Sequence, residues 1–170
     1  MRYMIRERFF RLGEDSDITD EQGQPVYHVD GKVFTLRNTL IVRDLAGAEV
    51  AKVEHSLFAL RPTYTITRQG EEVAEVRKKL LSPFVDRFTI DIPGPHDLQM
   101  TGSLFEHEYT ITRDDQVVAT VSKRWLSFTE TYGVEIAPGE DDVLILASVL
   151  ALDLAEDRER QARSARHDRD

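Results

Sequence analysis

Residues 143–155 read VLILASVLALDLA, and this stretch decides the fold. Leucine and alanine favour a helix, and thirteen residues are more than a buried strand usually holds. Ser148 and Asp153, the two polar residues, are five positions apart and share no helical face, so the helix has no side for water. Its length of about 20 Å falls short of the ~30 Å that a bilayer core requires. We therefore expect protein to surround this helix on all sides.

The residues on either side of this stretch define its ends. Pro138 to Asp142 read PGEDD, and acidic residues suit the N-terminus of a helix. Residues 156–170 are almost wholly polar and contain Glu/Arg pairs at i,i+4, which predict either a solvated helical extension or a frayed tail. We expect one barrel domain over 1–156, with its central helix at about 142–156, followed by a charged extension at 157–170.

An internal repeat supplies the material around the helix. The sequence YTITR at 64–68 recurs at 109–113, and nine of the sixteen positions in 64–79 are identical 45 residues later. Residues 69–71 and 114–116 separate the matching runs and have the composition of tight turns. Each copy is therefore expected to form a strand, a turn and a second strand.

Looser copies of this hairpin extend the repeat. They lie at 18–29 and 41–53, and a degenerate copy lies at 88–100 around Pro93-Gly94-Pro95. With the alternating segments 3–10 and 132–136, the number of strands reaches about twelve. Asp30-Gly31 predicts a further hairpin turn.

Sequential hairpins form an antiparallel meander, and a sheet of this many strands closes to remove its edges. The expected fold is all-β: an antiparallel closed barrel of about twelve strands that encloses the hydrophobic C-terminal helix. A helix inside the barrel leaves no room for a lipocalin-like ligand cavity.

Composition excludes several classes of protein. The 170 residues include no cysteine, which excludes disulfides, thiolate metal sites and cysteine nucleophiles. Lys and Arg number 22 against 31 Asp and Glu, so this is an acidic chain of net charge −9 that is not expected to bind nucleic acid. Because it shows neither a signal peptide nor a span of about twenty apolar residues, we expect a cytoplasmic chain without a transmembrane segment.

No catalytic motif is present in the sequence. There is no G-x-S-x-G elbow, no P-loop, no G-x-G-x-x-G loop and no HExxH. The histidines lack the spacing of a zinc site, and His107, between Glu106 and Glu108, is expected at a loop or strand end. We therefore expect neither an enzyme nor a cofactor or metal, and a monomer by default.

Basic residues next to large apolar ones form the candidate site. They end the second strand in both copies of the repeat, at equivalent positions: Arg77, Lys78 and Lys79 in one copy, and Lys123, Arg124 and Trp125 in the other. Cations of this kind could contact lipid phosphates while Trp125 enters the interfacial layer. The alternative is that the charges simply point outward from strand ends and Trp125 packs in the core.

The order of these features resembles the LURP-one-related family, which is grouped with the tubby C-terminal domain and the phospholipid scramblases. The resemblance is carried by the D-x-x-G-x-x-V-Y-x-V-x-G-K run at 20–32, the related turn at 44–53, the Tyr-x-Ile hairpins and the acidic step into the apolar helix. It implies a twelve-stranded barrel around a central helix. Tubby domains bind phosphoinositides, and scramblases are calcium-dependent membrane proteins, although the membrane anchor and cysteines of scramblases are absent here.

Two functions follow as expectations. The first is a non-enzymatic module that binds phospholipid or phosphoinositide head groups peripherally at a membrane. The alternative is a soluble protein-interaction or regulatory scaffold domain.

Overall fold

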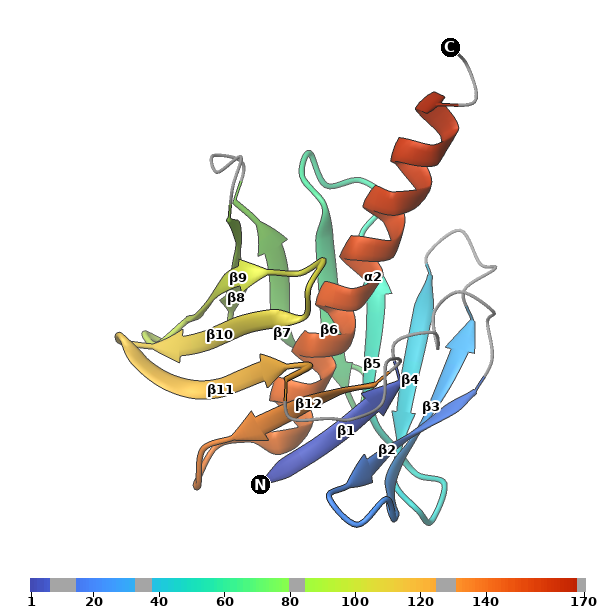
Figure 1. Cartoon of the computed structure of the whole chain (residues 1–170), viewed down its shortest axis with the longest axis vertical. Coiled ribbons are helices and arrows are strands. Elements are labelled where there is room, and N and C mark those ends of the chain that lie inside the picture. Colours follow the sequence, from blue (N-terminus) through green and yellow to red (C-terminus); the bar gives the residue numbers. More distant parts are fainter. Residues whose placement is uncertain (7–14, 33–37, 80–84, 125–130, 168–170) are drawn as a thin grey trace.

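The computed structural model describes residues 1–6, 15–32, 38–79, 85–124 and 131–167. Twelve antiparallel strands close into a barrel in which each strand pairs with its sequence neighbours and β1 pairs with β12 (Figure 1). The strands are β1 (Arg2–Arg6), β2 (Ser16–Asp20), β3 (Pro25–Lys32), β4 (Thr39–Arg43), β5 (Glu49–His55), β6 (Thr63–Arg68), β7 (Glu71–Lys78), β8 (Asp86–Asp91), β9 (Leu98–Ser103), β10 (Glu108–Arg113), β11 (Gln116–Ser122) and β12 (Thr131–Ile136). Helix α2 (Asp142–His167) follows them. The predicted all-β barrel around a C-terminal helix is confirmed.

The barrel has two unlike ends. At the hairpin end lie the tight turns that follow the even-numbered strands and the link from β12 to α2, at 21–24, 44–48, 69–70, 92–97, 114–115 and 137–141. At the exit end, α2 leaves the barrel beside the connections 56–62 and 104–107 (Figure 1). Because the strands alternate in direction, all odd-numbered strands finish at the exit end.

Two of the tight turns show why the D-x-x-G pattern recurs. Asp20 Oδ1 accepts hydrogen bonds from the backbone N–H groups of Gln22 and Gln24, at 2.9 and 2.8 Å. Asp44 Oδ1 likewise accepts hydrogen bonds from the backbone N–H groups of Ala46 and Ala48, both at 2.9 Å. Gly23 and Gly47 have φ of 77° and 86°, a backbone conformation that favours glycine. The motif therefore fixes turn geometry at the hairpin end.

The hairpin turn predicted at Asp30-Gly31 is wrong. Both residues lie within β3 and pair with Ile41 and Leu40 of β4. The Asp30 carboxylate accepts a hydrogen bond from Arg43 Nε at 2.7 Å across the two strands. Here cross-strand pairing outweighs the local turn preference of Asp-Gly.

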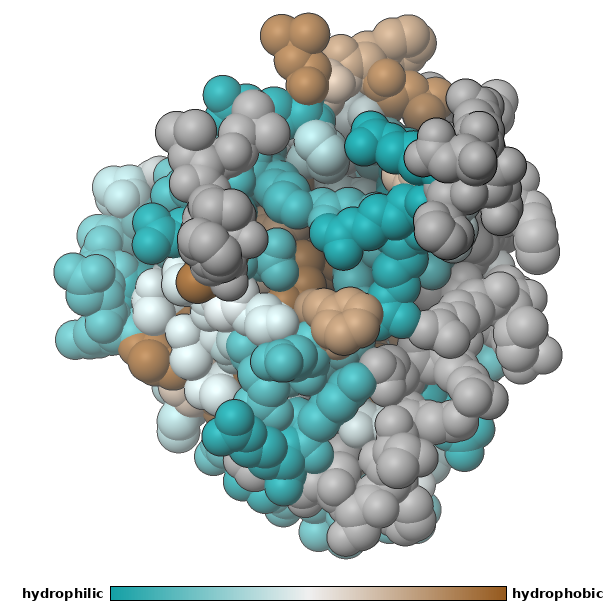
Figure 2. All heavy atoms as spheres, turned by 45° about the horizontal axis from the view of Figure 1, so that its top comes forward, coloured by the Kyte–Doolittle hydropathy of each residue, from teal (hydrophilic) through white to brown (hydrophobic). Residues whose placement is uncertain are grey.

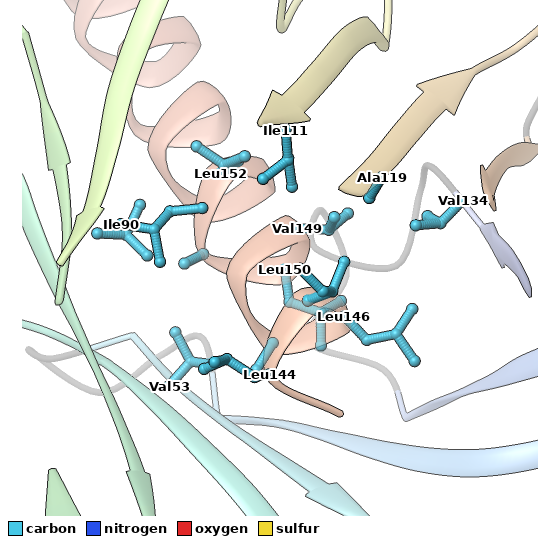
Figure 3. Close-up of a cluster of buried hydrophobic side chains, with 14 of the residues drawn as sticks. Val53, Ile90, Ile111, Ala119, Val134, Leu144, Leu146, Val149, Leu150 and Leu152 are labelled. Carbon is cyan, nitrogen blue, oxygen red and sulfur yellow. The ribbon is translucent and has the colours of Figure 1, made fainter. Parts of the chain in front are cut away.

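Helix α2 runs through the barrel and is buried on every side from Leu144 to Ala155. Figure 3 shows its apolar side chains among Val53, Ile90, Ile111 and Val134, which come from four different strands. Ser148 is accommodated because its hydroxyl donates to the Leu144 carbonyl at 2.8 Å. No helix in the described part of the chain has both the length and the apolar character needed to cross a membrane.

The start of α2 is fastened to the barrel by equivalent residues of the repeat. Arg68 forms two hydrogen bonds of 2.6 Å to Asp141, and Arg113 contacts both carboxylate oxygens of Glu140 at 2.7 Å. Asp141 also caps the helix, since its Oδ1 accepts the Leu144 N–H at 3.1 Å. The hydrogen bonds from Arg68, and to a lesser extent this cap, hold the pKa of Asp141 below its usual value despite its partial burial.

Candidate functional site

The exit end carries the candidate site. The predicted basic residues that the structure describes, Arg77, Lys78, Lys79, Lys123 and Arg124, all lie at this end, because β7 and β11 both finish there. Three strands, β8 to β10, separate the two groups in the barrel wall, so the repeat does not merge them into one cluster. Trp125 lies outside the described residues.

The basic groups after β7 are engaged with neighbouring polar groups. Arg77 pairs with Glu75 and Asp91, the latter at 3.0 Å. Lys78 contacts Glu159 of α2 and lies 3.7 Å from Asp86.

Lys79 and the cations of the second group have different surroundings. The Lys79 ammonium donates to Gln99, and the lysine is exposed. Arg124 is 84% exposed, and its Nε lies 3.8 Å from Glu108 Oε1, a long distance for an ion pair. Lys123 is half-buried. Two cations of the predicted groups, Lys79 and Arg124, are therefore exposed and form no close ion pair with a described residue.

A feature that the sequence analysis missed is an apolar tip on the connection 56–62. It consists of Leu57, Phe58 and Leu60, which are 43%, 93% and 105% exposed. Figure 2, with the exit end turned forward, shows apolar atoms projecting at the upper edge of a largely hydrophilic face. Side chains this exposed contribute nothing to the core, and a cluster of them usually marks an interaction surface. The signal in the sequence was the run Ser56 to Leu60, which matches neither strand of the repeat.

A small hollow of about 220 Å³ lies at the base of the tip, lined by Glu54, His55, Ser56, Leu57, Phe58 and Thr65. Burial, together with the positive charge of nearby Arg158, lowers the pKa of His55. Its ring packs edge-on against Tyr64, with centroids 5.2 Å apart. The imidazole that lines the hollow is therefore mainly neutral at pH 7.

The part of α2 that projects beyond the barrel is basic. Residues 157–167 contain four arginines against two carboxylates, whereas the whole chain has a net charge of −9. Residues 161–166 are exposed. The helical alternative for this segment is the one observed, with ion pairs from Glu156 to Arg160 and, at 3.9 Å, from Glu159 to Arg163. This basic segment leaves the barrel at the same end as the apolar tip (Figure 1).

Comparison with known proteins agrees with this fold. The family model described as LURP-one-related matches residues 1–153. The chain belongs to the LURP-one-related family. This LURP-one-related chain is 29% identical over 150 residues to the uncharacterized protein YxjI of Bacillus subtilis (strain 168), a match that covers 88% of the chain and 90% of that relative.

A solved structure shares the same architecture. The X-ray structure of a protein from Arabidopsis thaliana matches this LURP-one-related chain with a TM-score of 0.67, covering 91% of the chain and 90% of the Arabidopsis protein. Sequence identity is 17%, so this likeness shows the fold alone. The family expected from the sequence is confirmed, and no function comes with these names.

Proposed function

We propose that this protein is a peripheral membrane-binding module that attaches to anionic phospholipid through its exit end. The observation that carries the proposal is the apolar tip, whose Phe58 and Leu60 are almost completely exposed. A projecting tip of this kind fits the soft interfacial layer of a bilayer, where aromatic and aliphatic side chains leave water without needing a matching groove.

Charge supports the same orientation. Arg61 lies in the same connection as the tip, and Arg158 lies near His55 at its base. The projecting helix adds further arginines, and Lys79 and Arg124 stand on the same end of the barrel. Each basic residue near an anionic surface contributes about 1 kcal/mol. The proposal keeps the head-group role expected for the strand-end cations and adds the tip as the element that inserts.

The test is co-sedimentation with vesicles of phosphatidylcholine alone, or with phosphatidylserine or a phosphoinositide added, at about 0.1 M salt and at high salt. Screening over a Debye length of about 10 Å makes the salt comparison informative. We expect binding that requires anionic lipid and weakens with salt. Phe58→Ser/Leu60→Ser should weaken it at least about tenfold, because burying each side chain is worth about 1.5–3 kcal/mol.

Leu45 provides the matched control. It is an apolar residue that is 70% exposed, but it lies in a turn at the hairpin end. Leu45→Ser should bind vesicles like the wild type, whereas Lys79→Glu/Arg124→Glu should weaken binding to anionic lipid in particular. Equal losses from the Leu45 and the Phe58/Leu60 variants would contradict the proposal.

A protein partner is the second candidate, and the hollow beside the tip is the observation that favours it. Its six lining residues combine apolar and polar groups, which could receive one side chain of a partner. The vesicle experiment distinguishes the two functions. If the protein binds vesicles of no composition tested, the result favours the protein-interaction function.

A further inference from the structure

A buried polar cluster lies where α2 leaves the barrel. His107 Nε2 is 3.4 Å from Asp153 Oδ1 and 3.7 Å from Glu156 Oε2. The three residues are only 3%, 4% and 9% exposed. Each can offer one metal-ligand atom, and these atoms all lie within 4.8 Å of one another. We propose that His107, Asp153 and Glu156 bind a divalent transition-metal ion of the Zn²⁺ class, which pins the helix to the barrel wall.

The distances from the His107 nitrogen to the two carboxylate oxygens suit such an ion. Zinc binds imidazole nitrogen and carboxylate oxygen at about 2.0–2.2 Å, so two ligand atoms of a tetrahedral site lie about 3.4 Å apart. The observed separations of 3.4 and 3.7 Å are close to that value. One imidazole with two carboxylates is a hard-to-borderline ligand set, which suits zinc and its neighbours rather than copper(I).

The remaining carboxylate oxygens are already occupied by other groups. The Tyr132 hydroxyl donates to Asp153 Oδ2, and Arg160 pairs with Glu156 Oε1. Each carboxylate therefore presents its other oxygen to His107. Partners of this kind fix the orientation of metal ligands and raise their affinity.

A second and independent observation is a buried hydroxyl without a partner in the same region. The Tyr109 hydroxyl is buried in a residue only 3% exposed, and it forms no hydrogen bond within the described part of the chain. Tyr109 lies at the start of β10, two residues beyond His107 in the chain. A buried hydroxyl without a partner is costly. The oxygen of a metal-bound water would accept its hydrogen bond.

The fold builds the cluster from two segments far apart in the chain. Asp153 and Glu156 are three positions apart and share one face of α2. His107 ends the connection 104–107, where its N–H donates to the Leu104 carbonyl at 3.0 Å and its φ is 50°. The metal would thus join the helix to the connection between β9 and β10.

A surface cluster of the same composition provides a matched comparison. Asp15, His28 and Asp30 also group within ligand distance, but they are half-exposed or exposed. His28 Nδ1 is already 2.7 Å from Asp17, and His28 Nε2 is 3.6 Å from Asp30. Loss of this cluster should not change tight metal binding.

The experiment uses the full chain, stripped with a chelator and dialysed, then titrated with Zn²⁺ by calorimetry and with Co²⁺ by visible absorption. We expect one tight site per chain, intense tetrahedral Co²⁺ bands and a melting temperature that rises with Zn²⁺ but not with Mg²⁺. Tyr132→Phe should weaken Zn²⁺ binding about 10- to 100-fold. His107→Asn, which tolerates the left-handed backbone, should weaken it more.

His28→Asn is the control and should bind Zn²⁺ like the wild type. The proposal is overturned if the wild type binds no stoichiometric Zn²⁺, or if His107→Asn binds it as tightly as the wild type. Loss in His28→Asn alone would assign the metal to the surface cluster and would also overturn it. Should His107→Asn not fold, the Co²⁺ spectrum of the wild type and the Tyr132→Phe titration decide.

Discussion

At the scale of single residues, His107 combines deep burial with two carboxylate neighbours. Burial alone would lower the pKa of His107, but the hydrogen bond and charge of Asp153 and the charge of Glu156 outweigh it, so the pKa is raised. A histidine with a raised pKa binds its proton more tightly in the folded protein than in the unfolded chain. The positive charge of Lys123 acts in the opposite direction and lowers the pKa of His107.

The sign of the pH dependence follows from this shift. The stability that His107 contributes is fully present below its unfolded pKa of about 6.5, and it is lost as pH rises through the higher folded value. The free energy of unfolding of the chelator-treated wild type, from urea titrations between pH 6 and 9, should therefore fall with pH more steeply than that of His107→Asn.

His28→Asn serves as the reference for this measurement. The pKa of His28 is also raised, mainly by its hydrogen bond to Asp17, but the side chain is 44% exposed and solvent screens the pair. This variant should keep most of the slope of the wild type. Parallel pH profiles for the wild type and His107→Asn would show that the buried histidine is not coupled to folding.

The sequence predicts His107 at a loop or strand end, and it lies in the turn directly before β10, but its burial is not evident from the sequence. Its ligand-type neighbours lie on a helix far along the chain, so no local spacing reveals them. Asp153 stands out in the sequence as a polar residue in an apolar helix. Its buried carboxylate is tolerated because the closed barrel brings the Tyr132 hydroxyl and the His107 imidazole to it. Such contacts between distant segments are what a single sequence shows least.

At the scale of elements, the repeat determines how α2 begins. Arg68 and Arg113 end equivalent strands, and both contact the acidic link that precedes the helix. The acidic cap was predicted from the residues PGEDD, whereas the arginines that contact it were not. Asp-Gly at 30–31 shows the converse, since a strong local turn signal is overridden by pairing with β4.

We expect Asp141→Ala to destabilise the protein by about 0.5–2 kcal/mol, because it removes the helix cap. The change also leaves Arg68 without its two 2.6 Å hydrogen bonds. The measurement is the midpoint of urea unfolding, with the exposed Glu71→Ala as the control. Similar midpoints for the two variants would show that the cap is dispensable.

At the scale of the whole molecule, the barrel and its helix form one hydrophobic core. The buried apolar residues of α2 contact strands all around the wall, and β1 closes the ring by pairing with β12. The sequence predicted this architecture because a helix without a polar face requires an enclosing sheet. The apolar tip on 56–62 could not be predicted in this way, because packing does not constrain the residues of an exposed loop.

Two truncations separate the two parts of α2. The chain 1–160 keeps the buried half of the helix and should melt within a few degrees of the full chain, because residues 161–166 are exposed. The chain 1–141 lacks all ten buried apolar residues of the helix and leaves the barrel interior unfilled. The larger side chains among them are worth about 1.5–3 kcal/mol each when buried, so their joint loss of about 10–20 kcal/mol equals or exceeds the 5–15 kcal/mol by which most proteins are stable. We therefore expect 1–141 to show no cooperative melting by circular dichroism, and a cooperative β-sheet transition in it would mean that the strands alone specify the barrel.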